Sequence, residues 1–138
     1  MRMLRLLGRP LAEIVPYVCD TLVQQVSTSD GSLTIAPYAG NQTCSWNISL
    51  PDGIGSPELY FPVARFSYLE LGPSDSITIR DGPKATSPVI TVLTAANNSY
   101  YSLSVEAITA SSLFVTLNAA AGSSGNGFYL YPDSKCEV

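Results

Sequence analysis

The sequence predicts an all-β protein, a two-sheet antiparallel sandwich of about eight to ten strands. Short segments rich in β-branched and aromatic residues recur along the chain, and clusters of Gly, Pro, Asp and Asn separate them. No segment has a convincing helical period. The chain has 138 residues, of which 46% are hydrophobic, so it is one domain's worth and long enough to bury a sizeable core.

The expected strands follow one another at short intervals. They are Leu33–Ala36, Cys44–Leu50, Leu59–Leu69, Ile77–Ile79, Val89–Leu93, Tyr101–Val105, Leu113–Leu117 and Phe128–Tyr131. A turn signal at Asp30-Gly31 precedes the first strand, and Pro51-Asp52-Gly53 ends the second. Pro62 lies inside the third, which indicates an edge strand or a bulge.

The later strands are bounded in the same way. Asp81-Gly82-Pro83 ends the fourth strand, and Asn97-Asn98 follows the fifth. The sixth and seventh alternate cleanly between apolar and polar residues. The glycine-rich segment 122–127 joins the last two strands rather than a strand and a helix, so we do not expect it to bind phosphate.

The second expected strand has the clearest two-residue period. Cys44, Trp46, Ile48 and Leu50 alternate with polar residues, and such a period places them on a buried face. Asn47 belongs to the polar, outward set. A cysteine, a tryptophan and an outward asparagine thus fit one strand without conflict.

Three N-glycan sequons occur in the chain. They begin at Asn41, Asn47 and Asn97, and all three fall in expected loops or on an outward strand face. This distribution predicts N-glycosylation and an extracellular or cell-surface location. The alternative is that none of the three sequons is used.

Composition excludes several function classes. Charged residues make up 13% of the chain and the net charge is −4, which is unlike a nucleic-acid-binding protein. The chain has no histidine, which removes the commonest general base and the Ser-His and Cys-His nucleophile pairs. No run of 18 apolar residues exists that would span a membrane. We therefore expect a protein that is not an enzyme and has no catalytic residues.

The start of the chain differs from the rest in charge. Arg2, Arg5 and Arg9 lie in the first nine positions, and the remaining residues carry four basic and 11 acidic side chains. We interpret residues 1–16 as an extended N-terminal arm and residues 17–138 as the sandwich domain. A basic arm and an acidic domain would pair head to tail between molecules. The alternatives are a leader remnant and an ordinary soluble surface.

An ordered set of patterns over roughly residues 19–131 resembles the CUB domain, an extracellular jelly-roll β-sandwich. The patterns are Gly31-x-Leu-x-Ile-x-Pro-Tyr38, Cys44-x-Trp-x-Ile-x-x-Pro-x-Gly53, Leu59-x-Phe-x-Val-x-x-Phe66, Leu69-Glu70, Asp75-x-Ile-x-Ile-x-Asp-Gly82, Leu113-x-Val-x-Leu117 and Gly127-Phe-x-x-Tyr131. No single piece is specific, but the ordered set is much stronger. The resemblance implies a jelly-roll topology and a non-catalytic module that binds partners through loops at one end of the sandwich.

The resemblance also implies a disulfide between Cys19 and Cys44, whose separation of 25 positions is close to that of the family's first pair. Closing this loop would contribute about 3 kcal/mol in the chain-entropy model. The family's usual second bridge has no counterpart, since no cysteine lies between Cys44 and Cys136. Cys136 is therefore left over, either as an intermolecular or externally paired cysteine or as a free thiol.

Many CUB domains bind calcium through three acidic side chains, and this sequence matches two of them. Glu70 and Asp75 stand at the first two positions, and Ala120 stands at the third. Calcium prefers six to eight oxygen ligands, so we expect a weak, degenerate site without bound calcium and assign no cofactor. The alternative, which we prefer, is that Glu70 and Asp75 are a solvated loop pair that caps turn amides.

Four tyrosines in the last third of the chain are candidates for an aromatic recognition patch. Tyr100, Tyr101, Tyr129 and Tyr131 would suit either protein or sugar. Adjacent tyrosines on a strand point to opposite faces, so we expect about half of the four to lie in the core.

These observations favour a non-catalytic extracellular glycoprotein module of CUB-like type that binds protein or carbohydrate. The alternative is a self-assembling structural subunit of an extracellular filament or coat, whose N-terminal arm adds as a strand to a neighbour's sheet edge. An enzyme would need two carboxylates facing one cleft, and Glu70 with Asp75 is the only plausible pair. The expected partners are an extracellular protein, a glycan or copies of the chain itself.

Overall fold

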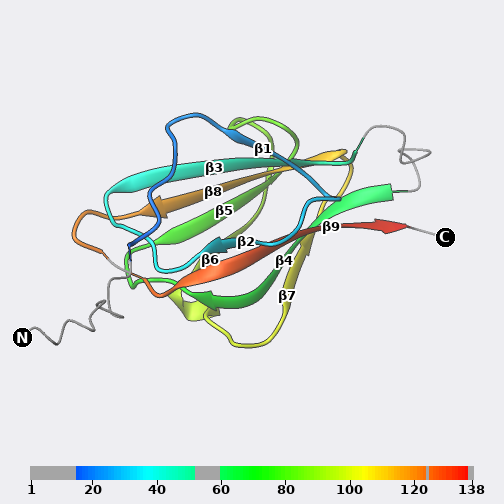
Figure 1. Cartoon of the computed structure of the whole chain (residues 1–138). Coiled ribbons are helices and arrows are strands. Elements are labelled where there is room, and N and C mark those ends of the chain that lie inside the picture. The colour runs from blue at the N-terminus through cyan, green and yellow to red at the C-terminus, as the bar shows by residue number, and fades with distance from the viewer. Residues whose placement is uncertain (1–14, 52–59, 124, 137–138) are drawn as a thin grey trace, which may run out of the picture.

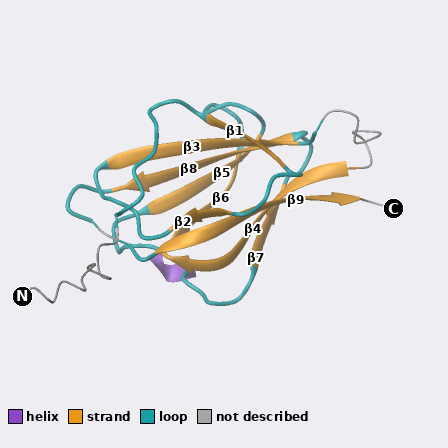
Figure 2. Cartoon of the chain, viewed as in Figure 1, coloured by secondary structure: helices purple, strands orange, loops and turns teal. Residues whose placement is uncertain are grey.

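The computed structural model describes residues 15–51, 60–123 and 125–136, which form a two-sheet β-sandwich (Figure 1). The described residues contain nine strands and one short 3-10 helix. Figure 2 draws the strands in orange and the helix in purple. The strands are β1 (Gln24–Ser27), β2 (Leu33–Ile35), β3 (Gln42–Ser49), β4 (Tyr60–Glu70), β5 (Ser76–Asp81), β6 (Val89–Thr94), β7 (Leu103–Glu106), β8 (Ser112–Ala119) and β9 (Gly127–Cys136), and the helix is η1 (Ala95–Asn97). The predicted all-β sandwich is confirmed. Most of the expected N-terminal arm, the Asp52-Gly53 turn and Leu59 lie outside the described residues.

The strands form a five-stranded sheet in the order β1-β3-β8-β5-β6 and a four-stranded sheet in the order β2-β9-β4-β7. All strand pairs are antiparallel except β1 with β3, which is parallel. The parallel pair arises because the chain crosses to the other sheet for β2 before it returns as β3. The sequence did not predict β1, whose only buried apolar residue is Val26.

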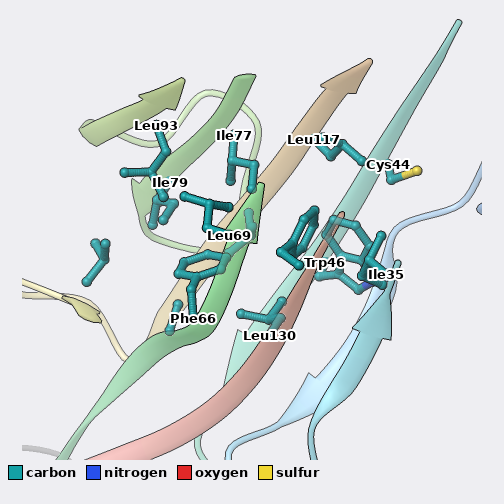
Figure 3. Close-up of a cluster of buried hydrophobic side chains, with 14 of the residues drawn as sticks. Ile35, Cys44, Trp46, Phe66, Leu69, Ile77, Ile79, Leu93, Leu117 and Leu130 are labelled. Carbon is teal, nitrogen blue, oxygen red and sulfur yellow. The ribbon is translucent and has the colours of Figure 1, made fainter. Parts of the chain in front are cut away.

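The core between the sheets is centred on aromatic rings (Figure 3). The rings of Trp46 and Phe128 meet edge to face with centroids 6.3 Å apart, and the Phe66 ring lies 5.9 Å from that of Phe128. Tyr38 packs on Phe128 from the loop after β2. Trp46 and Ile48 are fully buried, as the two-residue period predicted. The aliphatic residues around them are Ile35, Leu69, Ile77, Ile79, Leu93, Leu113, Leu117 and Leu130.

A disulfide joins Cys19 to Cys44, as the resemblance implied. It fastens the segment before β1 to the first core strand of the five-stranded sheet. Cys136 is free and exposed at the end of β9.

Pro62 lies in the longest strand, β4, and the expectation that it marks an edge strand or a bulge was wrong. β4 is a central strand between β9 and β7, and its register shift lies between Phe66 and Tyr68 rather than at the proline. Pro62 is accommodated because pairing with β7 begins one residue later, at Val63. The extra residue at the shift, Ser67, is exposed.

No helix in the described ranges is long and apolar enough to cross a membrane.

Truncation of the central ring tests this core. We expect Phe128→Ala to lower the free energy of unfolding by about 3–5 kcal/mol, because it leaves a cavity between Trp46, Phe66 and Tyr38. Urea denaturation measures the loss. Tyr101→Ala, at a side chain that is 84% exposed, is the control and should change stability by less than about 0.5 kcal/mol. Equal losses in the two variants would contradict this description of the core.

Candidate functional site

A buried carboxylate holds together the loops at one end of the sandwich. Asp75, between β4 and β5, is only 2% exposed. Its Oδ1 accepts the backbone N–H of Ala120 at 2.8 Å, and its Oδ2 accepts the hydroxyls of Ser123 at 2.6 Å and Tyr38 at 2.5 Å. The backbone N–H of Gly72 donates to the Tyr38 hydroxyl at 2.9 Å. We call Asp75, Tyr38, Gly72, Ala120 and Ser123 the Asp75 latch.

The protonation states in the latch follow from these bonds. Burial alone raises the pKa of Asp75, but the donors Ser123, Tyr38 and the backbone amides hold that pKa below its ordinary value. Burial and the bond to Asp75 raise the pKa of Tyr38. At neutral pH the latch therefore joins an ionised carboxylate to a neutral phenol. The expectation of a solvated Asp75 was wrong, although it does cap a turn amide.

The latch is packed too tightly to admit even a methyl group. A Cβ on Gly72 would lie 2.6 Å from the Ser123 hydroxyl oxygen and 2.7 Å from Asp75 Oδ2. A Cβ on Gly125 would collide with the ring of Tyr38. Glycine at these two positions is what lets the loops after β4 and β8 close onto Asp75.

These residues do not fit a calcium ion. Both Asp75 oxygens already accept bonds from protein donors, and the Ala120 position offers an N–H donor to that carboxylate. A hollow of about 320 Å³ beside the latch is lined by Pro73, Ser74, Ala120, Ala121, Gly122 and Ser123, none of which is acidic. In the described ranges, no group of three or more His, Cys, Asp or Glu side chains is placed to hold a metal.

Glu70 lies at the end of β4 and takes part in a different cluster. Its Oε1 accepts the hydroxyls of Tyr68 at 2.7 Å and Tyr100 at 3.2 Å, and its Oε2 accepts the Asn126 amide at 2.6 Å. These bonds lower the pKa of Glu70. Burial and the bond to Glu70 raise the pKa of Tyr68 to about 12. Glu70 thus orients aromatic side chains rather than facing Asp75 across a site.

The tyrosines around Glu70 form an exposed aromatic surface. The ring of Tyr68 lies 5.5 Å from that of Tyr100 and 5.4 Å from that of Tyr129. Tyr129 pairs with Tyr68 across β9 and β4, and Tyr131 lies two residues further along β9, opposite Arg65. We call Tyr68, Tyr100, Tyr129 and Tyr131 the tyrosine face.

The expectation that about half of the candidate tyrosines lie in the core was wrong. Tyr100 is 73% exposed, Tyr129 is 41% exposed and Tyr131 is 43% exposed, and Tyr101 is also on the surface. Tyr129 and Tyr131 are two residues apart, so they share one face of β9. Tyr100 and Tyr101 lie in the loop before β7 rather than on a strand. The sequence reasoning missed Tyr68, which the β4 bulge directs to this face.

The three sequons take different positions on the surface. Asn41 is exposed in the loop before β3 at a φ of 59°, and Asn97 is exposed in η1. Asn47 is on the outer side of β3, half-buried, and its Nδ2 donates to Gln25 at 2.9 Å. The three acceptor sites remain predictions, as does an intermolecular role for Cys136.

Similar proteins are found by comparison of structures but not by comparison of sequences. No family model matches the sequence, and no curated protein matches it. The full extracellular region of zebrafish Gpr126/Adgrg6 matches with a TM-score of 0.58 and 20% identity, over 81% of this chain and 14% of that one. The MASP-1 CUB2 domain bound to Ca2+ matches with a TM-score of 0.50 and 18% identity, over 83% of this chain and 99% of that one. The fold is CUB-like.

The likeness covers the fold alone. Tyr38 and Asp75 of the latch fall within the CUB-like sequence patterns described above. Ser123 and Asn126, which bind Asp75 and Glu70, lie outside those patterns. These two lie in a glycine-rich segment with no periodic signal, so only the folded chain brings them to Asp75 and Glu70. The chain spans only 14% of the length of the zebrafish region that it matches.

A pH titration tests the Glu70 cluster. We expect the pKa of Tyr68 to fall from about 12 toward the ordinary value of about 10 in Glu70→Gln, because the acceptor charge is lost. Ultraviolet absorbance follows phenolate formation, and the difference from Tyr68→Phe isolates this one side chain among the tyrosines. Identical titration curves for the chain with and without the Glu70 charge would contradict the arrangement.

Proposed function

We propose that this chain is a non-catalytic extracellular glycoprotein module of CUB-like type that binds protein or carbohydrate through the tyrosine face. The observation that carries the proposal is the contact of three tyrosine rings on the outer side of the four-stranded sheet, where the half-buried Tyr68 supports the exposed Tyr100 and Tyr129. Tyrosine supplies a large contact area with a polar tip and is enriched in binding surfaces.

The surroundings of the rings support a recognition surface. Arg65 and Asp133 form an ion pair of 2.8 Å beside Tyr131, which gives the aromatic centre a charged rim. Aromatic centres with polar rims are the usual anatomy of a protein interface. The hydroxyls and the Glu70 carboxylate also offer hydrogen bonds to sugar hydroxyls.

An extracellular location and a non-catalytic role fit the same observations. The Cys19–Cys44 disulfide suits an oxidising compartment, and the exposed sequons at Asn41 and Asn97 suit a glycoprotein. Catalysis by Glu70 and Asp75 would need both carboxylates in one open cleft, whereas Asp75 is buried and fully hydrogen-bonded.

Binding assays with tyrosine variants test the proposal. The purified full chain is applied to arrays of extracellular proteins and of glycans, and the affinity for each bound species is measured. We expect Tyr129→Ala and Tyr100→Ala to weaken binding by about tenfold or more, because central aromatic residues carry most binding energy. Tyr101→Ala is a matched control outside the ring contacts and should bind normally. Binding that is unaffected by the first two substitutions, or absent from both arrays, contradicts the proposal.

A second candidate function is self-assembly, and a groove between two sheet edges favours it. β6 and β7 are edge strands of different sheets, and a hollow of about 460 Å³ between them is lined by Ile90, Thr91, Leu93, Asn97, Leu103, Ser104, Val105 and Glu106. Exposed sheet edges accept added strands. The leucines of residues 1–16 suit the apolar part of this groove. The arginines of that segment would compete with Lys135, which lies 3.0 Å from Glu106, for this carboxylate.

Sizing of the purified chain with and without residues 1–16 tests this candidate. Self-assembly predicts a mass above that of the monomer that increases with concentration and returns to the monomer on truncation. The same measurement on Cys136→Ser separates strand addition from disulfide crosslinking. A monomer in every case removes the candidate.

A further inference from the structure

We propose that the Asp75 latch replaces a bound cation with protein hydrogen-bond donors, so that the tyrosine face keeps its shape without calcium. As a statement about how that face is regulated, the inference rests on the proposed function. The latch itself is a property of the described residues and is testable without a ligand.

The hydrogen bonds of Asp75 leave no free oxygen for a metal. Three donors from two loops, the one after β2 and the one after β8, point at its two oxygens, and the carboxylate is almost completely buried. A calcium ion at Oδ2 would have to displace the Ser123 or Tyr38 hydroxyl, and one at Oδ1 would have to compete with the Ala120 N–H. The close packing around Gly72 leaves little room for either hydroxyl to move aside.

The loop after β8 donates hydrogen bonds to Asp75 and offers no acidic side chain as a calcium ligand. Ala120 presents its N–H to Asp75, and the same residue's carbonyl accepts the N–H of Ser123 at 3.1 Å and that of Asn41 at 2.9 Å. This turn brings the Ser123 hydroxyl to Asp75 Oδ2. The neutral Ser123 hydroxyl thus stabilises the buried charge of Asp75 by a hydrogen bond. An acidic side chain in its place would add a second negative charge, which a cation would have to balance.

The latch and the tyrosine face are connected through β4 and the loop before β9. Glu70 ends β4 just before Gly72 of the latch, and Asn126, which binds Glu70, follows Gly125, which packs on the Tyr38 ring. Closure of the latch therefore fixes the loop positions from which Glu70 holds Tyr68 and Tyr100. Calcium is not needed to order either cluster.

Calcium titration of the full chain tests the inference. The chain is treated with EDTA and then titrated with CaCl2 through the range of about 0.1–1 mM that weak extracellular modules use, with calorimetry and thermal unfolding as readouts. We expect no binding heat and the same Tm in EDTA and in CaCl2. Ser123→Ala should lower the Tm by about 2–6 °C, equally in both solutions, because it removes a buried charge-assisted hydrogen bond.

The control is Ser111→Ala, at an exposed serine before β8, which should leave the Tm unchanged. Calcium binding with a rise in Tm overturns the inference, as does a Ser123→Ala loss no larger than that of the control. Neither readout depends on the tyrosine face. A calcium-independent latch without tyrosine-dependent binding would therefore refute only the proposed function.

Discussion

The hydrogen bonds of one buried carboxylate set the shape of one end of the sandwich. Asp75 draws together the loop after β2, the loop after β4 and the loop after β8, and so it joins the two sheets where their strands end. A buried charge is stable only when it is fully paired or hydrogen-bonded. The need to satisfy Asp75 therefore dictates a hydroxyl at Ser123, a hydroxyl at Tyr38 and a glycine at position 72.

The aromatic surface depends on a second local constraint, the bulge in β4. Without the extra residue at Ser67, the side-chain alternation of β4 would carry on unchanged past Phe66. The bulge keeps Phe66 and Leu69 in the core while Tyr68 faces outward to meet Tyr129. One inserted residue thus separates the apolar interior from the tyrosine face on the same strand.

Local periodicity predicted the parts of the molecule that depend on neighbours in sequence. The alternation around Trp46 identified β3 and its buried face, and turn signals separated most of the strands. β1 was not predicted, because Val26 alone gives no periodic pattern and the pairing of β1 with β3 is parallel. The latch was not predicted, because Tyr38 and Ser123 are 37 and 48 positions from Asp75 in sequence. Only tertiary structure brings such residues together. The tyrosines were misjudged because two of them share a face and two lie in a loop.

The position of β9 has a consequence for how the chain acquires its structure. β9 is the last of the described strands in sequence order, yet it lies inside the four-stranded sheet and pairs with both β2 and β4. Until it emerges from the ribosome, β2 lacks its one partner among the described strands, and β4 lacks one of its two neighbours in the sheet. The domain therefore cannot complete its core one strand at a time during translation. Its folding must wait for β9, with the slow, long-range pairing that such topologies impose.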